Sequence, residues 1–360
     1  MKLYIDASRA NKPERTGVEW YAFKMIQALK KVIPQETGVL LLTKENLMDD
    51  FGEFPKNWKH KKLHWPFPRF WTQLRLSWEM RKHKDAILFI PASAPPLIHP
   101  KLVVTIHDVG FAAMPKVYSW FDRKFQDWTT RRAVNHADLI CTPSQFSKNE
   151  IKKYYDAKDA HIAIVPNALV VDEMSTPRKP SQALLYIGRI EHKKNITTLI
   201  EAFEILKRSG NNVELQLVGK PGFGYEEIAQ RIEQSIYKKD IHLLGYISQQ
   251  KKSELLSQAG ILLFPSWYEG FGIPILEAAA YGVPVIASNI PVHKEIAADT
   301  ITYAQVDNPR DWVKKVEEMF ESYPPSQDMI DEKKQILNQY SWGKSAQIFW
   351  ENVQKLQTVD

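Results

Sequence analysis

The stretch from residue 260 to residue 281 constrains the fold more than any other part of this sequence. Residues 260–264 form a short apolar run that is closed by Pro265, which predicts a buried strand. Residues 275–281 predict a helix, and Pro274 suits its first position. In an open α/β sheet the ligand binds where a strand leads through a turn into a helix. The unpaired N–H groups at that helix end favour an anion.

Two carboxylates accompany this turn. Glu269 lies in the turn, and Glu277 follows eight residues later within the predicted helix. Each carboxylate can accept paired O–H donors, as sugar hydroxyls offer beside a phosphate. Gly270 and Gly272 let the backbone approach such a ligand closely. A helix-starting Glu and a solvated Glu would be the plain structural alternative, but both together in this glycine frame favour a binding site.

The stretch from Phe264 to Glu277 resembles the E-x7-E signature of the retaining glycosyltransferases of family 4, which have the GT-B architecture. The resemblance implies an α/β fold with two Rossmann-like, doubly wound domains facing a central cleft. It also implies a C-terminal helix that crosses back to the first domain. The implied activity is transfer of a hexose from a nucleotide diphosphate-sugar with retention of anomeric configuration.

The length and the pattern of elements predict two domains. A chain of 360 residues commonly forms two. The alternation of strands and helices lapses between residues 167 and 182, where Pro177 and Pro180 lie among polar residues. We expect an acceptor-binding Rossmann-like domain at 1–172, a linker at 173–182, a nucleotide-sugar-binding domain at 183–340 and a crossover helix at 341–360.

A basic turn follows the first predicted strand of the second half. Arg189 and Lys194 lie five residues apart and can converge on one anion, Arg as a planar fork and Lys as a point charge. A solvated basic loop is the alternative. In the family, the Arg and Lys of a G-R-x4-K-N pattern hold the donor diphosphate, and this sequence matches the pattern at Gly188, Arg189, Lys194 and Asn195.

The resemblance assigns further donor contacts in the second half. Backbone groups of Tyr246 and Ile247 would face the nucleotide base, and Glu277 would hold the ribose hydroxyls. Glu269 would hold the sugar hydroxyls together with the backbone N–H groups of the helix start, at Phe271, Gly272 and Ile273.

The first half contributes Gly17 and His107. Thr16 and Glu19 have the spacing of a capping box, so Gly17 is expected at a helix start above the first strand. His107 follows a predicted strand at its carboxyl end. A lone His at a strand end is commonly structural, but a His at the matching position of the family contacts the donor sugar. Asp108 would orient that imidazole or cap the next turn.

Composition limits the cofactors and the compartment. There is no Asp-x-Asp motif and no His/Cys cluster with metal-ligand spacing, so we expect no metal and no cofactor. Arg189 and Lys194 would then neutralise charge on the leaving diphosphate. The one cysteine, Cys141, falls in a strand pattern and should be buried. No N-terminal apolar region and no run near the roughly 20 residues that span a bilayer occur, so we expect a cytoplasmic protein.

Residues 56–84 differ from the rest of the chain. They contain nine Lys or Arg, one Glu and four of the eleven Trp. Phe67, Phe70, Trp71, Leu74 and Trp78 would share one stripe of a helix. Such a stretch can lie peripherally on the inner face of an anionic membrane, or pack its stripe on the sheet. Because no nucleic-acid motif accompanies it, we expect no nucleic-acid partner.

Two segments look most like bacterial mannosyltransferases of O-antigen and capsular polysaccharide synthesis. They are Thr-Gly-Val-Glu-Trp-Tyr from Thr16 and Trp-Thr-Gln-Leu-Arg-Leu-Ser from Trp71. They favour GDP-mannose as donor, with UDP-sugars as the alternative, and a saccharide or lipid-linked acceptor. An epimerase or phosphorylase of the same architecture, or a non-catalytic sugar-nucleotide-binding protein, stays open. The sequence lacks the dinucleotide fingerprint of a nicotinamide oxidoreductase, which argues against that class of enzyme.

Overall fold

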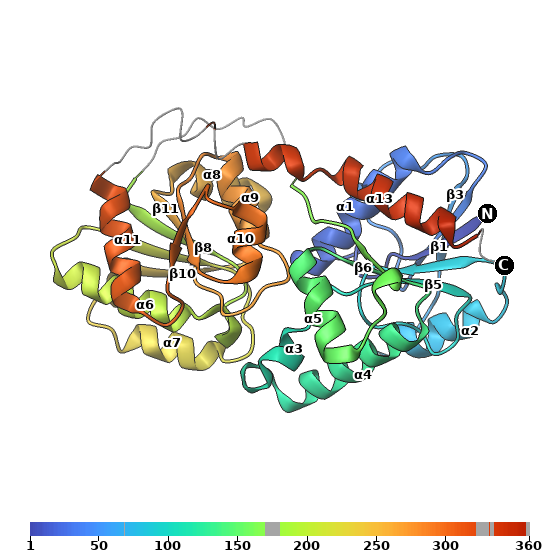
Figure 1. Cartoon of the computed structure of the whole chain (residues 1–360), viewed down its shortest axis with the longest axis horizontal. Coiled ribbons are helices and arrows are strands. Elements are labelled where there is room, and N and C mark those ends of the chain that lie inside the picture. The colour runs from blue at the N-terminus through green and yellow to red at the C-terminus, as the bar shows by residue number, and fades with distance from the viewer. Residues whose placement is uncertain (68, 170–180, 322–330, 332–334, 358–360) are drawn as a thin grey trace. The chain divides into compact units, whose positions relative to one another are not determined.

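The computed structural model describes residues 1–67, 69–169, 181–321, 331 and 335–357. The chain divides into two compact units (Figure 1). The first unit comprises residues 1–113, 120–167 and 341–360, and the second comprises residues 114–119 and 168–340. The expected linker at 173–182 lies outside the described residues except for its last two positions.

The first unit is built on a seven-stranded parallel sheet. Its strands lie in the order β3-β2-β1-β4-β5-β6-β7. The direction of winding reverses between β1 and β4, which are neighbours in the sheet. The strands are β1 (Lys2–Asp6), β2 (Gly38–Thr43), β3 (Trp58–Lys62), β4 (Ile87–Ile90), β5 (Lys101–Thr105), β6 (Leu139–Thr142) and β7 (Ile162–Ile164). The helices are α1 (Gly17–Val32), α2 (Ser77–Met80), α3 (Gly110–Ala113), α4 (Trp120–His136) and α5 (Gln145–Tyr155).

The second unit repeats this design with six parallel strands. Their order is β10-β9-β8-β11-β12-β13, so the winding reverses between β8 and β11. The strands are β8 (Ala183–Ile187), β9 (Glu214–Val218), β10 (Ile241–Gly245), β11 (Ile261–Phe264), β12 (Val285–Ser288) and β13 (Thr302–Ala304). The helices are α6 (Ile196–Arg208), α7 (Tyr225–Glu233), α8 (Gln249–Gln258), α9 (Ile273–Ala280), α10 (Pro291–Ala297) and α11 (Pro309–Glu321). Phe203 and Trp312 are fully buried in its core.

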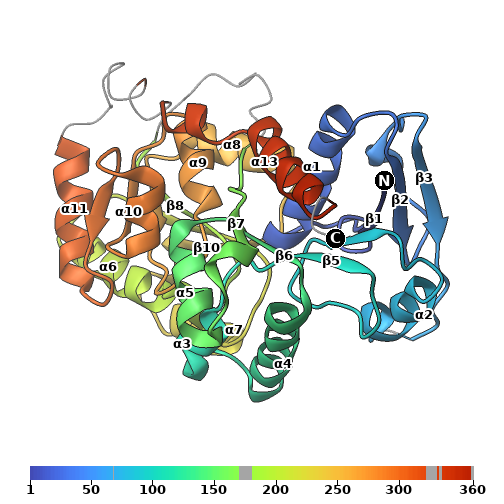
Figure 2. The same ribbon diagram turned by 45° about the vertical axis from the view of Figure 1, so that its right-hand side comes forward.

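The last helix, α13 (Trp342–Lys355), belongs to the first unit. It packs on α1, and Figures 1 and 2 both show the red α13 beside the blue α1. Phe349 is completely buried, and its ring centroid lies 4.4 Å from that of Phe89 on β4. The predicted fold class is therefore confirmed: two doubly wound α/β sheets, with a final helix that returns to the first unit.

The predicted burial of Cys141 is also confirmed, and the helix that follows its strand has a capped start. Ser144 is the N-cap of α5, and its Oγ accepts a hydrogen bond from the backbone N–H of Ser147 at 3.0 Å. Cys141 is fully buried, and burial raises the pKa of its thiol far above the usual range. No helix in the described parts of the chain combines the length and apolar character that crossing a bilayer requires.

The single helical stripe expected within residues 56–84 is wrong. The segment contains the edge strand β3, then a π-helical turn, η2 (Trp71–Leu76), and the short α2. Phe70 precedes η2 with φ of 64°, so Phe67 and Phe70 are outside any helix. Trp71 is buried, and its Nε1 donates to the carbonyl of Leu63 at 3.0 Å. The other four members of the stripe are exposed.

A 3₁₀ turn, Ile336–Gln339, precedes the last helix. β13 and α7 complete the second unit and were not predicted from the sequence.

Candidate active site

The candidate site of the second unit lies at the reversal point of its sheet. The turns that follow β8 and β11 begin at the carboxyl ends of two adjacent strands, which is where open α/β sheets bind ligands. Lys194 ends the first turn, and Glu269 lies in the second. Lys194 Nζ and Glu269 Oε1 form an ion pair at 2.5 Å, and both side chains are almost completely buried. This pair joins the two turns across the reversal point.

The surroundings of Glu269 keep it ionised. Ser266 Oγ donates to Glu269 Oε1 at 2.6 Å. Burial by itself would raise the pKa of Glu269, but the ammonium groups of Lys194 and Lys193 and the hydrogen bonds from Lys194 and Ser266 outweigh it. The pKa of Glu269 therefore lies below its ordinary value, and the group is a carboxylate that can accept hydroxyl donors at neutral pH.

Glu277 has a cation of its own. It lies on α9 and is buried, and its Oε1 is 2.5 Å from Lys252 Nζ on α8. Sequence reasoning missed Lys252 because nothing in the pattern around it differs from a solvated helix start. Its importance comes from a partner 25 positions away.

Arg189 is held apart from Lys194. Its Nη2 donates to the carbonyl of Pro221 at 3.2 Å, and its Nε lies 3.6 Å from Glu191 Oε2. The side chain is about half exposed, whereas Lys194 is buried against Glu269. The structure thus places both cations on the same turn but gives them different partners, and their convergence on one anion stays a prediction.

Close packing of backbones shapes the turn that carries Arg189. Gly219, directly after β9, has φ of 151°, and a Cβ on it would overlap the carbonyl oxygen of Gly188. On Gly188 itself, a Cβ would lie 2.6 Å from the hydroxyl of Tyr186. That hydroxyl donates to the carbonyl of Arg189 at 2.8 Å. The glycines therefore let two turns meet while Tyr186 fixes the start of the basic turn.

The start of α9 lies directly after the turn of Glu269. Ile273 is the first helical residue and Gly272 is the N-cap, with φ of 145°, a backbone region that favours glycine. Phe271 is buried and contacts the Tyr340 ring edge-on at 5.3 Å. The first N–H groups of a helix lack intrahelical acceptors, so this end is suited to a phosphate or hydroxyl group.

Tyr246 and Ile247 follow the edge strand β10. The Tyr246 ring is partly exposed, and Lys220 Nζ lies 4.6 Å from its centroid. The structure places this segment at the carboxyl end of a strand of the same sheet, two strands from β8. Its contact with a base stays a prediction.

His107 and Gly17 lie in the first unit. Gly17 starts α1 behind the N-cap Thr16, whose backbone N–H donates to Glu19 Oε2 at 3.1 Å, one arm of the predicted capping box. His107 Nε2 lies 3.2 Å from the carbonyl of Pro91, so Nε2 carries the proton in this contact. The ring meets Tyr21 edge-on at 4.6 Å, and burial lowers the pKa of His107. Asp108 Oδ1 accepts from the Gly110 N–H at 2.8 Å, so Asp108 caps the following turn.

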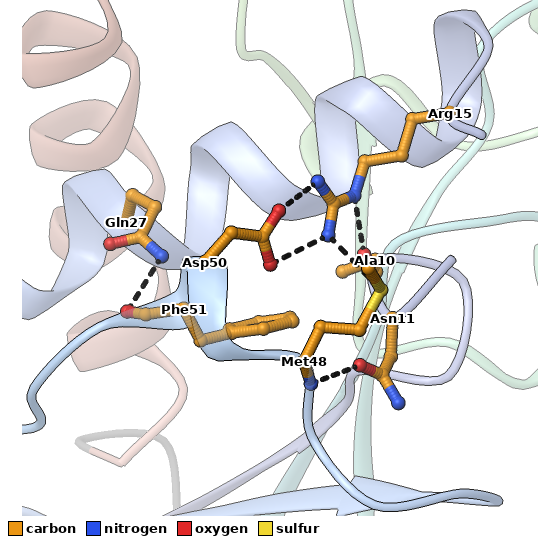
Figure 3. Close-up of polar contacts among 7 residues, drawn as sticks. All are labelled: Ala10, Asn11, Arg15, Gln27, Met48, Asp50 and Phe51. Carbon is orange, nitrogen blue, oxygen red and sulfur yellow. Dashed lines mark hydrogen bonds and ion pairs between the residues drawn. The ribbon is translucent and has the colours of Figure 1, made fainter. Parts of the chain in front are cut away.

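A buried arginine braces the turn between β1 and α1. Figure 3 shows the Arg15 guanidinium directed at Asp50, with Nη1 and Nη2 at 2.5 and 3.1 Å from the two carboxylate oxygens. Arg15 Nε donates to the carbonyl of Ala10 at 2.7 Å, and Asn11 Oδ1 accepts from the Met48 N–H at 2.9 Å. The Arg15 guanidinium also lies 4.0 Å from the Phe23 ring centroid. These contacts fix the turn that precedes Gly17.

His293 on α10 is a second residue that sequence reasoning missed. It is fully buried, and its ring lies 4.9 Å from that of Phe264, the last residue of β11. Nδ1 is 2.9 Å from the Ser288 carbonyl and must donate to it, whereas Nε2 has no hydrogen-bond partner among the described residues. Burial lowers the pKa of His293 to about 4. The ring is therefore neutral, and it packs against the last residue of β11, the strand that leads into the candidate site.

Comparison with known proteins agrees with this arrangement. A chain with two such sheets, a basic turn and a carboxylate turn at one reversal point, and a returning last helix has the features of a GT-B glycosyltransferase. The model described as Glycosyltransferase Family 4 matches residues 15–173, and the model described as Glycosyl transferases group 1 matches residues 172–336. The two models together span residues 15–336, and the chain belongs to the glycosyltransferase family that they describe.

Similar proteins include two bacterial mannosyltransferases. The chain is 30% identical over 240 residues to O-antigen chain mannosyltransferase B of Escherichia coli, covering 62% of each chain. It is 23% identical to O-antigen chain mannosyltransferase RfbU of Salmonella typhimurium, covering 93% of this chain and 98% of the relative. Among solved structures, Anabaena HepE in complex with UDP and glucose superposes with a TM-score of 0.72 at 15% identity, over 98% of this chain and 99% of that one. The match thus spans less than two thirds of the first relative.

Proposed function

We propose that this protein transfers a mannosyl group from GDP-mannose to a saccharide or lipid-linked acceptor during surface polysaccharide synthesis. Membership of the family supports nucleotide-sugar-dependent transfer, and the names of the two O-antigen relatives support mannose. A lipid-linked acceptor would place the reaction at the cytoplasmic face of the membrane.

The observation that carries this proposal is the buried pair of Lys194 and Glu269 at the reversal point. Ionic groups are costly to bury alone, and each member of this pair satisfies the other. A sugar diphosphate can replace both partners at once, because its phosphate oxygens accept from an ammonium and its sugar hydroxyls donate to a carboxylate. The pair therefore holds in place the two groups that the donor needs.

The remaining residues have roles that follow from their positions. Arg189 would turn from Pro221 toward the diphosphate, and the start of α9 would add N–H donors. Glu277 would accept the ribose hydroxyls on its other carboxylate oxygen, while Lys252 keeps its contact with Oε1 and holds the carboxylate in position. His107 would contact the donor sugar from the first unit, as the family resemblance implies.

The proposed reaction exchanges one bond at the anomeric carbon for another on the same face. The bond from C1 to the diphosphate oxygen breaks, and a bond from C1 to the acceptor oxygen forms. The proton of the acceptor hydroxyl passes to the leaving phosphate. Lys194 and Arg189 would stabilise the negative charge that grows on that phosphate in the transition state.

A UDP-sugar is the second candidate donor. The similar fold of HepE was determined with UDP and glucose, and the segment around Tyr246 contacts a base only through the backbone in our proposal. The side chains of this segment therefore do not separate guanine from uracil.

Thermal unfolding with GDP, GDP-mannose, UDP and UDP-glucose tests the donor. A ligand bound only by the folded state raises the unfolding temperature. We expect the guanine pair to raise it most. A larger shift with the uracil pair would replace GDP-mannose by the alternative donor, and no shift with any nucleotide would remove the proposed site.

The catalytic role of Arg189 and Lys194 is tested by measuring turnover of whichever donor binds in the thermal experiment. Arg189→Ala and Lys194→Ala should each lower kcat by about 100-fold, the scale of losing one contact to transition-state charge. Lys238→Ala is the matched control, because Lys238 is an exposed lysine of the same unit paired with Glu233. Equal turnover of all three variants would exclude both cations from the mechanism. Arg189→Ala stays informative if Lys194→Ala is unstable, because the Arg189 side chain is half exposed.

A further inference from the structure

The strongly exposed large apolar side chains of the first unit gather in three short segments. Within the described residues they come only from positions 67–78, 97–98 and 120–128. We define the aromatic face by Phe70, Trp78, Leu97, Phe121, Phe125 and Trp128. Such a concentration is unusual on a protein that is surrounded by water alone, and it marks an interaction surface.

Contacts between aromatic rings join the segments on either side of this face. The ring of Phe70, before η2, lies 6.5 Å from that of Phe125 on α4. Phe125 stacks on Phe121 at 6.3 Å and lies 6.0 Å from Trp128. The guanidinium of Arg69 lies 5.3 Å from the Phe121 ring centroid. Residues some 50 positions apart in the sequence therefore form one continuous surface.

The turn around Leu97 connects α2 to α4. The N–H of Leu97 donates to Ser77 Oγ on α2 at 2.8 Å, and Arg132 Nη2 on α4 donates to the carbonyl of Leu97 at 2.5 Å. In Figures 1 and 2, α2 and α4 both lie along the lower side of this unit. The aromatic face thus extends over both helices and the turn between them.

The aromatic rings of α4 contribute little to the core. The buried residues of this helix are Thr129, Thr130 and Ala133, all of which are small. Trp120, Phe121 and Trp128 are 70, 49 and 45% exposed. Packing of the first unit therefore does not explain why the helix carries them.

Cations accompany the rings. Arg75 and Lys82 lie 5.0 and 5.4 Å from the Trp78 ring centroid. The acidic group of α2, Glu79, is buried and is paired with both Lys61 and Arg75, so these three groups together keep a net positive charge. Tryptophan and other aromatic rings beside lysine and arginine match the headgroup region of an anionic bilayer.

We propose that the aromatic face docks the first unit on an anionic lipid bilayer, with the rings at the depth of the headgroups and the cations against lipid phosphates. Phe121 and Phe125 stack on each other, which leaves each ring at most one face for a base, whereas insertion among headgroups needs no free ring face. Lipid therefore fits better than single-stranded nucleic acid. This docking goes beyond the transfer reaction and depends on neither the donor nor the acceptor.

Sedimentation with vesicles tests the docking. Wild-type protein should bind vesicles of phosphatidylglycerol and phosphatidylethanolamine, bind them less as salt rises, and bind phosphatidylcholine vesicles weakly. Trp78→Ser/Phe121→Ser and Arg69→Ala/Lys82→Ala should each lower the partition coefficient by about tenfold or more. Ile236→Ser is the matched control, because Ile236 is 83% exposed in the second unit and should leave binding unchanged.

Several results would overturn the docking proposal. They are equal partition of all variants, equal binding of the wild type to phosphatidylcholine, stronger binding to single-stranded RNA, and self-association that Trp78→Ser/Phe121→Ser abolishes. Unchanged unfolding temperatures of the variants would show that they fold, and the charge variant alters only exposed side chains.

Transfer to a short water-soluble acceptor separates this proposal from the proposed function. Vesicle binding without any sugar transfer would leave docking intact and remove the function. Transfer without vesicle binding would do the reverse.

Discussion

The ion pair of Lys194 and Glu269 explains how two charged residues can both be buried at the carboxyl ends of adjacent strands. The free-energy cost of removing these two charges from water is offset during folding, because each group is the other's partner. Ser266 adds a hydrogen bond to the carboxylate. A donor that displaces the pair therefore meets charges that are already positioned. Such preorganisation is the main way in which a protein stabilises charge in a transition state.

His293 should make stability depend on pH. Its pKa is lowered from 6.5 to about 4 in the folded protein, so the unfolded chain binds a proton between these values and the folded chain does not. The unfolding free energy should therefore be highest above pH 6.5 and should fall by about 3 kcal/mol as the pH drops toward 4. Urea unfolding of the wild type at a series of pH values between 7 and 4 measures this loss.

The matched variant is His293→Asn. The amide can keep a donor toward the Ser288 carbonyl but cannot titrate. The difference in unfolding free energy between wild type and variant should shrink as pH falls through this window. A difference that stays constant from pH 7 to pH 4 would assign the acid sensitivity to other groups.

Residues whose surroundings are local in the chain could be selected from the sequence as candidates. Glu269 and Lys194 could be selected because each lies in a turn with glycines or cations next to it in the chain. Lys252 and His293 could not, because their significance comes from Glu277 and Phe264, which are distant in sequence. The partner of Arg189 was also unpredictable, since Pro221 O is reached only once two turns are folded together.

At the scale of elements, the approach of the turns after β8 and β9 should depend on Gly219. A side chain there would overlap the carbonyl of Gly188 and require a backbone region almost restricted to glycine. Gly219→Ala should therefore lower the unfolding free energy by at least about 3 kcal/mol. Chemical denaturation of the full chain measures the change.

Gly210→Ala is the control for this effect. Gly210 also has a positive φ, of 88°, but a Cβ there would meet no atom within 4 Å. It should cost only about 1 kcal/mol, the penalty for left-handed backbone. Equal costs at the two glycines would mean that conformation alone, and not the contact between turns, is responsible.

The elements differ in how well their sequences predicted them. The apolar run of β11 was recognised because both faces of a central parallel strand are buried. β3 was missed because its sequence, Trp-Lys-His-Lys-Lys, is that of a charged edge strand with only Trp58 buried. The aromatic residues at the start of α4 were not recognised as a surface, because their partner Phe70 comes from another segment.

At the scale of the whole molecule, the last helix contributes its stability to the unit in which the chain begins. α13 follows the second unit in sequence but packs on α1, and Phe349 fills a position against Phe89. The two units thus have separate cores although the chain passes between them more than once. A cavity made in one core should weaken mainly that unit.

Hydrogen exchange of the full chain tests this separation with two matched variants. Phe349→Ala removes a completely buried ring of the first unit, and Phe203→Ala removes one of the second, each at a cost of about 4 kcal/mol. Phe349→Ala should speed exchange in β4, β5 and β6 and leave β8 and β9 protected, while Phe203→Ala should do the opposite. A nucleotide that binds the second unit should restore protection only in Phe203→Ala, because ligand binding stabilises the unit that holds it. Faster exchange throughout the chain in both variants would show instead that the units unfold together, and that the final helix couples them into one cooperative structure.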